Sequence, residues 1–175
     1  VCARGAAVAL RGVRACIASG LFECVRAALP SQRKPQAGLI IRVSSCAGRF
    51  ASRLTGPAYN ATKRAVIALS ESINMEECTN GIRASSVLPG EVATPILRKR
   101  PVPPPKDEQD RMTQAADLGQ AILFIATMPA RPFVNEPISA PTWTPSSPQG
   151  PGPPQKPHAE WRGNPARARP PSASR

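Results

Sequence analysis

Two short apolar segments separated by one long amphipathic segment constrain the fold of this chain more than any other feature. The segments GLIIRVSS (38–45) and IRASSVLPG (82–90) are apolar on both faces and contain β-branched residues, as buried parallel strands do. Between them, from about Pro57 to Thr79, apolar residues recur at helical spacing. Strand, helix and strand in this order predict a parallel βαβ unit with a right-handed crossover.

The long helix should carry one buried and one solvated face. Its expected apolar stripe consists of Val66, Leu69 and Ile73, and its expected solvated acids are Glu71, Glu76 and Glu77. A helix over 12–29 should end at Pro30. The remaining expectations are a helix over 113–128, a small helix at 94–97, a last strand over 134–140, and loops over 46–56 and 98–110.

The chain is strongly basic, but the distribution of charge does not indicate a nucleic-acid site. There are 23 basic and 11 acidic residues, which gives a net charge of +12. The cations are scattered among Ala, Gly and Pro, and they are not interleaved with aromatic side chains that could stack on bases. We therefore expect no specific nucleic-acid partner. We also expect no membrane span, because arginines interrupt the apolar start of the chain.

Cysteine and histidine usage argues against several kinds of site. The 5 cysteines are odd in number and no two form a CxxC pair, so neither a disulfide framework nor a zinc site is indicated. The single histidine, His158, lies in a proline-rich stretch, which argues against a histidine triad or a metal centre. Reduced thiols favour a cytoplasmic protein.

The only tyrosine of the chain, Tyr59, is followed four positions later by Lys63. On a helix these two side chains lie on the same face, one turn apart. A nearby ammonium favours the phenolate form of a tyrosine, which tunes the pair towards proton transfer at neutral pH. The spacing alone is weak evidence, since a tyrosine beside a solvated lysine also arises by chance.

Further polar and small residues stand where the two predicted strands end. Ser45 ends the first strand, and Pro89 and Gly90 end the second, with Thr94 shortly after. Ligands bind at the carboxyl ends of strands in open parallel sheets. Taken alone, Ser45 could merely start a loop, and the Pro-Gly pair could be an ordinary turn.

Taken together, these segments resemble the short-chain dehydrogenase/reductase family. The resemblance rests on GLIIRVSSCAGRF, GPAYNATKRAVIALSESINMEE and GIRASSVLPGEVATPIL, which follow one another with family-like spacing over residues 38–97. More loosely it covers about residues 16–143. It implies a doubly wound Rossmann-type α/β domain that transfers hydride between NAD or NADP and a carbonyl or alcohol substrate.

The resemblance also implies a role for each matching residue. Tyr59 would be the general acid/base, and Lys63 would lower its pKa and bind the nicotinamide ribose. Ser45 would orient the substrate oxygen, with Ser44 the less favoured choice. The residues that would line the nicotinamide pocket are Pro89, Gly90 and Thr94. Family members commonly form homo-oligomers through the helix that bears the tyrosine.

The chain departs from the family pattern at both ends. The glycine-rich phosphate-binding turn is absent, and Ile17 stands where the family places an asparagine. We therefore expect a truncated parallel sheet that lacks the N-terminal strands. We divide the chain into a poorly matching segment (1–15), a partial catalytic domain (16–143) and a Pro/Arg-rich disordered tail (144–175). The alternative to an oxidoreductase is a non-catalytic fragment or interaction module.

Overall fold

The computed structural model describes residues 17, 19–52, 55–100 and 102–141, and a parallel sheet of three strands stands at its centre. The strands β1 (Gly38–Val43), β2 (Ile82–Pro89) and β5 (Ile138–Ser139) lie in the order β1–β2–β5. β1 pairs with β2 along its whole length, with Val43 opposite Val87. β5 extends the sheet beside the last two residues of β2.

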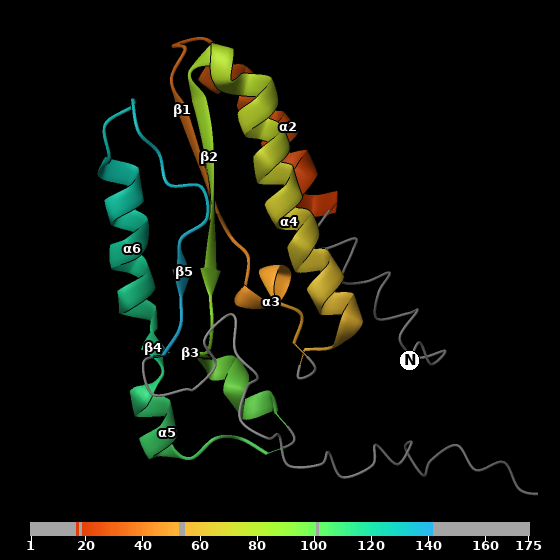
Figure 1. The fold of residues 1–175 in the computed structure, drawn as a ribbon, viewed down its shortest axis with the longest axis vertical. Helices are drawn as coiled ribbons and strands as arrows, with labels where there is room; N and C mark the ends of the chain where they lie inside the picture. Colours follow the sequence, from red (N-terminus) through yellow and green to blue (C-terminus); the bar gives the residue numbers. More distant parts are fainter. Residues whose placement is uncertain (1–16, 18, 53–54, 101, 142–175) are drawn as a thin grey trace, which may run out of the picture.

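Helices cover both faces of this sheet (Figure 1). α2 (Gly20–Arg33) and α4 (Gly56–Glu77) lie on one face, and α6 (Ala115–Thr127) lies on the other. The one-turn helix η2 (Cys78–Asn80) connects α4 to β2. β1, α4 and β2 therefore form the expected βαβ unit, and the described residues have an α/β Rossmann-type architecture.

The main apolar core lies between the sheet and the α2–α4 layer. It consists of Val25, Ile73, Ile82 and Ala84, with Leu29, Ile40 and Leu69 packed against it. Burying an aliphatic side chain of this size contributes about 1.5–3 kcal/mol. The stripe predicted on the long helix is confirmed, because Val66 and Ile73 are buried and Leu69 packs on the core.

Several short elements gather beyond the carboxyl ends of the strands. α3 (Cys46–Arg49) follows β1, and β3 (Val92–Ala93), η3 (Pro95–Lys99) and α5 (Lys106–Arg111) follow β2. β3 pairs in parallel with β4 (Thr113–Gln114), which leads into α6. The expected loops 46–56 and 98–110 are thus only partly irregular, because α3 occupies the start of one and α5 the end of the other.

The predicted end of the first helix is wrong. α2 continues through Pro30 to Arg33. A proline inside a helix removes one backbone hydrogen bond. Pro30 lies on the exposed side of α2, where water can serve the carbonyl that loses its partner. In the same turn the Ser31 hydroxyl donates to the Ala28 carbonyl at 2.7 Å.

The last strand is shorter than predicted, and its pairing explains why. The expected strand 134–140 is reduced to Ile138–Ser139. The Asn135 and Pro137 carbonyls nevertheless accept hydrogen bonds from Ser86 N and Leu88 N, at 2.8 Å and 2.9 Å. Pro137 has no N–H group to continue a regular ladder, so this stretch pairs through its carbonyls.

The prediction for Glu77 is also wrong, because this residue is not the solvated acid that helical spacing predicts. Only 3% of the residue is exposed. Its carboxylate forms an ion pair with Arg33 of α2 and accepts a hydrogen bond from Asn80 Nδ2 at 2.8 Å. Glu77 therefore ties the end of α2 to the end of α4.

Two of the predicted segments lie outside the described residues, namely 1–15 and the tail 144–175. Within the described part of the chain, no helix is both long enough and apolar enough to cross a membrane. Within the same part, no group of three or more His, Cys, Asp and Glu side chains is placed to hold a metal ion.

Candidate active site

Two consecutive serines follow β1, and the structure gives them different roles. Ser44 is buried, and its hydroxyl donates to the Lys63 carbonyl of α4 at 2.8 Å. Ser45 is half-buried and caps α3, with its Oγ accepting from Ala47 N at 3.2 Å. A hydroxyl that accepts in this way still has its own proton to donate. Ser44 is thus used to hold the fold together, while Ser45 retains a donor.

Tyr59 and Lys63 are neighbours on α4, as their spacing predicts. Lys63 Nζ lies 5.6 Å from the centroid of the Tyr59 ring, within the range of a cation–π interaction. The same ammonium donates to the Val43 carbonyl at 3.2 Å, at the end of β1. Burial lowers the pKa of Lys63 below its ordinary value. The lysine therefore connects the tyrosine to the strand end.

The carboxyl end of β2 is held against β5 by Gly90. Its N–H donates to the Ser139 carbonyl at 2.7 Å. A Cβ atom at this position would lie 3.2 Å from that carbonyl oxygen and 3.3 Å from Ala140 Cα. The glycine therefore has a packing reason within the chain itself. Pro89 is buried, and Thr94 is half-buried at the start of η3, where its hydroxyl makes no capping hydrogen bond.

Cys46 is a residue of this region that sequence reasoning did not identify. Its thiol donates to the Leu88 carbonyl at 3.1 Å and lies 3.7 Å from the Ser139 carbonyl. Burial raises the pKa of this thiol. Cys46 therefore binds the end of β1 to the ends of β2 and β5. Its only sequence signal is its position directly after Ser45.

Some of the predicted site residues are joined by hydrogen bonds, whereas others are related only because the strands they follow are neighbours. Ser44, Val43 and Lys63 are joined by hydrogen bonds between β1 and α4. Ser45 and Gly90 follow the ends of adjacent parallel strands. Within the described part of the chain, no hydrogen bond joins Tyr59 to Ser45.

A cavity of about 250 Å³ lies elsewhere on the molecule, between α4 and the segment that precedes β5. None of the predicted site residues lines it. Its lining consists of Ile67, Ser70, Glu71, Asn74, Phe133, Asn135 and Glu136. The candidate site is therefore an open region at the strand ends and not this cavity.

The comparison with protein-family models identifies the family of this chain. The model of the short chain dehydrogenase family matches residues 9–103, which is more than half of the chain. The chain belongs to the short-chain dehydrogenase family. An uncharacterized oxidoreductase of Staphylococcus epidermidis is 30% identical over 117 residues, covering 67% of this chain and 48% of the relative.

Solved structures of short-chain dehydrogenases and reductases share the fold. A 3-oxoacyl-[acyl-carrier protein] reductase with bound NAD from Brucella melitensis superposes with a TM-score of 0.62 at 24% identity, covering 74% of this chain and 49% of that one. A serine dehydrogenase complexed with NADP+ superposes with a TM-score of 0.59 at 23% identity, covering 70% and 51%. This short-chain dehydrogenase chain spans about half the length of the relatives it matches.

Proposed function

We propose that the chain carries the proton-transfer part of an NAD(P)-dependent oxidoreductase that interconverts a carbonyl and an alcohol. Family membership supports the reaction class. The observation that carries the proposal is the position of Lys63, whose half-buried ammonium lies against both the Tyr59 ring and the Val43 carbonyl. A cation held at this point can stabilise the phenolate that forms when a tyrosine gives up its proton.

Each residue has one task in the proposed reaction. Tyr59 donates its phenolic proton to the substrate oxygen during reduction and takes it back during oxidation. Lys63 holds its charge beside the phenol in both directions. Ser45 donates its free hydroxyl proton to the same substrate oxygen, which keeps that oxygen in place.

The described residues offer partners for the nicotinamide end of the cofactor but not for its pyrophosphate. When bound, the cofactor supplies or accepts the hydride. Lys63 has ammonium protons beyond the one it gives to Val43, so it can bind a ribose hydroxyl, and the Thr94 hydroxyl is available for the carboxamide side. We assign Pro89 and Gly90, at the carboxyl end of β2, to the same pocket. The described residues contain no glycine-rich turn ahead of a helix that would hold the pyrophosphate.

The alternative of a non-catalytic module is not favoured by the family match. We further propose a small-molecule substrate, family-type self-association and a cytoplasmic location. Three cysteines in the described residues, Cys24, Cys46 and Cys78, are free thiols, which supports a reducing compartment. The α4 helix that bears Tyr59 is one candidate oligomer surface, and the exposed apolar side chains of α6 are another.

The test uses the full chain and measures cofactor binding first and substrate turnover second. NADH and NADPH are titrated while their fluorescence is followed, and oxidation is then measured with a panel of aldehydes and ketones. We expect saturable binding. Tyr59→Phe should keep this binding and reduce turnover by about 10²–10⁴-fold, the usual contribution of a positioned general acid.

Lys63→Met tests the lysine itself, because it keeps much of the side-chain volume and removes the charge. It should weaken both cofactor binding and turnover. The matched control is Lys34→Met, which removes an exposed lysine that follows α2. Absence of binding by the full chain, or unchanged turnover in Tyr59→Phe, would contradict the proposal.

A further inference from the structure

The cavity between α4 and the segment that precedes β5 is held open by hydrogen bonds on both of its sides. On the α4 side, Asn74 donates to the Ala84 carbonyl of β2 at 2.9 Å and accepts from Ala84 N at 2.6 Å. On the other side, the Val134 carbonyl accepts from the Ser85 hydroxyl at 2.6 Å. Both sides are therefore fixed to β2, and the volume of about 250 Å³ belongs to the fold.

Apolar surface in this cavity comes from Ile67 of α4 and from Phe133. Ile67 is fully buried, whereas Phe133 is 42% exposed. An aromatic ring that lines a cavity can hold an apolar group, and its face also attracts a cation. A volume of about 250 Å³ is slightly small for a drug-sized ligand and suits a molecule of about ten non-hydrogen atoms.

Two of the polar side chains that line the cavity have no partner in the described part of the chain. Glu71 and Asn135 are exposed, and their side chains form no hydrogen bond or ion pair with the residues that the structure describes. Two further lining residues are already used, because Asn74 bonds to β2 and the Ser70 hydroxyl accepts from Arg42. A ligand that carries hydrogen-bond donors would therefore find free acceptors at Glu71 and Asn135.

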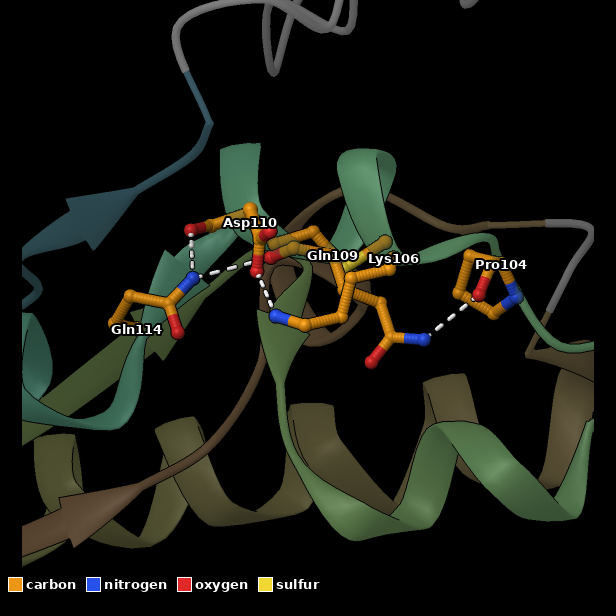
Figure 2. Close-up of polar contacts among 6 residues, drawn as sticks. Pro104, Lys106, Gln109, Asp110 and Gln114 are labelled. Atoms are coloured by element: carbon orange, nitrogen blue, oxygen red, sulfur yellow. Dashed lines mark hydrogen bonds and ion pairs between the residues drawn. The ribbon is translucent and has the colours of Figure 1, made fainter.

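The charge of the cavity lining is opposite to that of the chain. The chain has a net charge of +12. The described residues that line the cavity include two acids, Glu71 and Glu136, and no lysine or arginine. Glu136 Oε2 lies 3.7 Å from Arg49 Nε, which is a long contact for an ion pair. In α5, by contrast, Lys106 Nζ lies 2.5 Å from Asp110 Oδ1 (Figure 2). Glu136 can therefore accept a second and closer cation.

We propose that this cavity binds a small organic amine, in which a primary ammonium group is carried on an apolar or aromatic body. The ammonium donates to the carboxylates of Glu71 and Glu136 and to the Asn135 amide oxygen, so that its three N–H donors meet three acceptors. The apolar body packs on Ile67 and Phe133. The site is separate from the candidate active site, and it goes beyond the proposed oxidoreductase function.

The test uses the full chain labelled with para-fluorophenylalanine, and it follows the fluorine resonance of Phe133, assigned with Phe133→Leu. Phenethylamine is titrated at neutral pH, with phenylethanol, phenylpropanoate and methylammonium for comparison. We expect phenethylamine to bind at least about tenfold more tightly than each of the three. Equal affinity for phenylethanol or phenylpropanoate would overturn the role of the carboxylates, and equal affinity for methylammonium would overturn the role of the apolar lining. Absence of binding by phenethylamine would overturn the site.

Variants locate the binding. Glu71→Gln/Glu136→Gln should weaken phenethylamine binding about tenfold and leave phenylethanol unchanged. The control, Glu76→Gln/Asp107→Asn, removes two exposed acids that lie outside the cavity lining, and it should change neither. Arg49→Gln should instead tighten phenethylamine binding about twofold to threefold, because it releases Glu136. Circular dichroism checks the fold of each variant. Equal losses in both double variants, or weaker binding in Arg49→Gln, would refute the site.

Tyr59→Phe and a parallel NADH titration separate this inference from the proposed function. Tyr59 does not line the cavity, so phenethylamine binding should be unchanged in Tyr59→Phe. Loss of amine binding in this variant would place the amine at the strand ends and overturn the assignment to the cavity. Amine binding that depends on Glu71 and Glu136 while NADH does not bind would leave the amine site standing without an oxidoreductase.

Discussion

At the scale of single residues, two buried charges differ in how fully their surroundings compensate them. Glu77 has both an arginine and an amide partner, and these hold its pKa at about 2, with the Arg33 hydrogen bond as the largest cause. Arg42 on β1 is 4% exposed, and its Nη2 donates to the Ser70 hydroxyl. Its Nε and Nη1 atoms are buried and have no hydrogen-bond partner among the described residues.

The Glu77 carboxylate predicts an acid-sensitive step in stability. A carboxyl with a lowered pKa in the folded state adds stability above its ordinary value of 4.5 and loses it as the pH falls through about 2. Glu77→Gln should therefore be less stable than the wild type at neutral pH and should show a flatter profile in that window. Urea unfolding between pH 7 and pH 2 measures both.

The control for this prediction is Glu76→Gln, which changes the exposed neighbour on α4. It should follow the wild-type profile. A Glu77→Gln chain that loses as much stability on acidification as the wild type would show that another carboxyl is responsible.

The Arg42 side chain predicts a gain of stability on substitution. A buried charge without an acidic partner is unfavourable, and burial alone lowers the pKa of Arg42 to about 10. Arg42→Met should raise the free energy of unfolding by roughly 1–3 kcal/mol, because a hydrophobic side chain of similar length fills the space. The urea midpoint measures this, and Arg42→Lys, which keeps the charge, should bring no such gain.

At the scale of elements, the turn between α4 and β2 determines where the long helix can end. Gly81 has a φ of 67° and closes η2 through its N–H bond to the Cys78 carbonyl at 3.1 Å. A Cβ atom here would lie 2.0 Å from the Gln36 carbonyl oxygen, at the start of β1. The glycine thus serves the turn and the approach of two chain segments at once.

Gly81→Ala should destabilise the protein by roughly 2–4 kcal/mol, because backbone strain and a backbone clash coincide. Gly119→Ala is the matched control. Gly119 is exposed within α6, and a Cβ atom added there would meet no atom within 4 Å, so the change should stabilise by about 0.5–1 kcal/mol. Thermal unfolding compares the two variants. Equal effects would contradict this account of the turn.

At the scale of the whole molecule, the helices on both faces of the sheet expose large apolar side chains to solvent. α6 exposes Leu123 at 55% and Phe124 at 62%. On the other side, α4 exposes Met75 at 80% and α2 exposes Phe22 at 50%. β1 is an edge strand within the described sheet, with β2 as its partner. Apolar area and a strand edge both favour association.

Leu123→Gln/Phe124→Gln should therefore reduce self-association of the chain, because it removes apolar area from the α6 surface. Sedimentation velocity at several concentrations measures the change. Met75→Gln tests the competing proposal that α4 is the oligomer surface. Dissociation by Met75→Gln alone would favour α4, and dissociation by the double variant alone would favour α6.

The local sequence pattern was sufficient to predict the central βαβ unit and the position of Tyr59 beside Lys63. Both depend on periodicity, which relates residues that are near in sequence. The sequence alone also predicted Ser45 and Gly90 at strand ends, since each follows a short apolar segment that reads as a strand. The family resemblance was confirmed by the match to residues 9–103.

Only the tertiary structure decided how these residues are held. Ser44 rather than Ser45 bonds to α4, Cys46 joins three strand ends, and Glu77 turns inward to Arg33. Each of these contacts joins residues far apart in the chain, from 19 positions for Ser44 and Lys63 to 93 for Cys46 and Ser139. Helical and strand periodicity report which face a residue occupies but not which partner it meets there. The partner is set by how helices pack on the sheet.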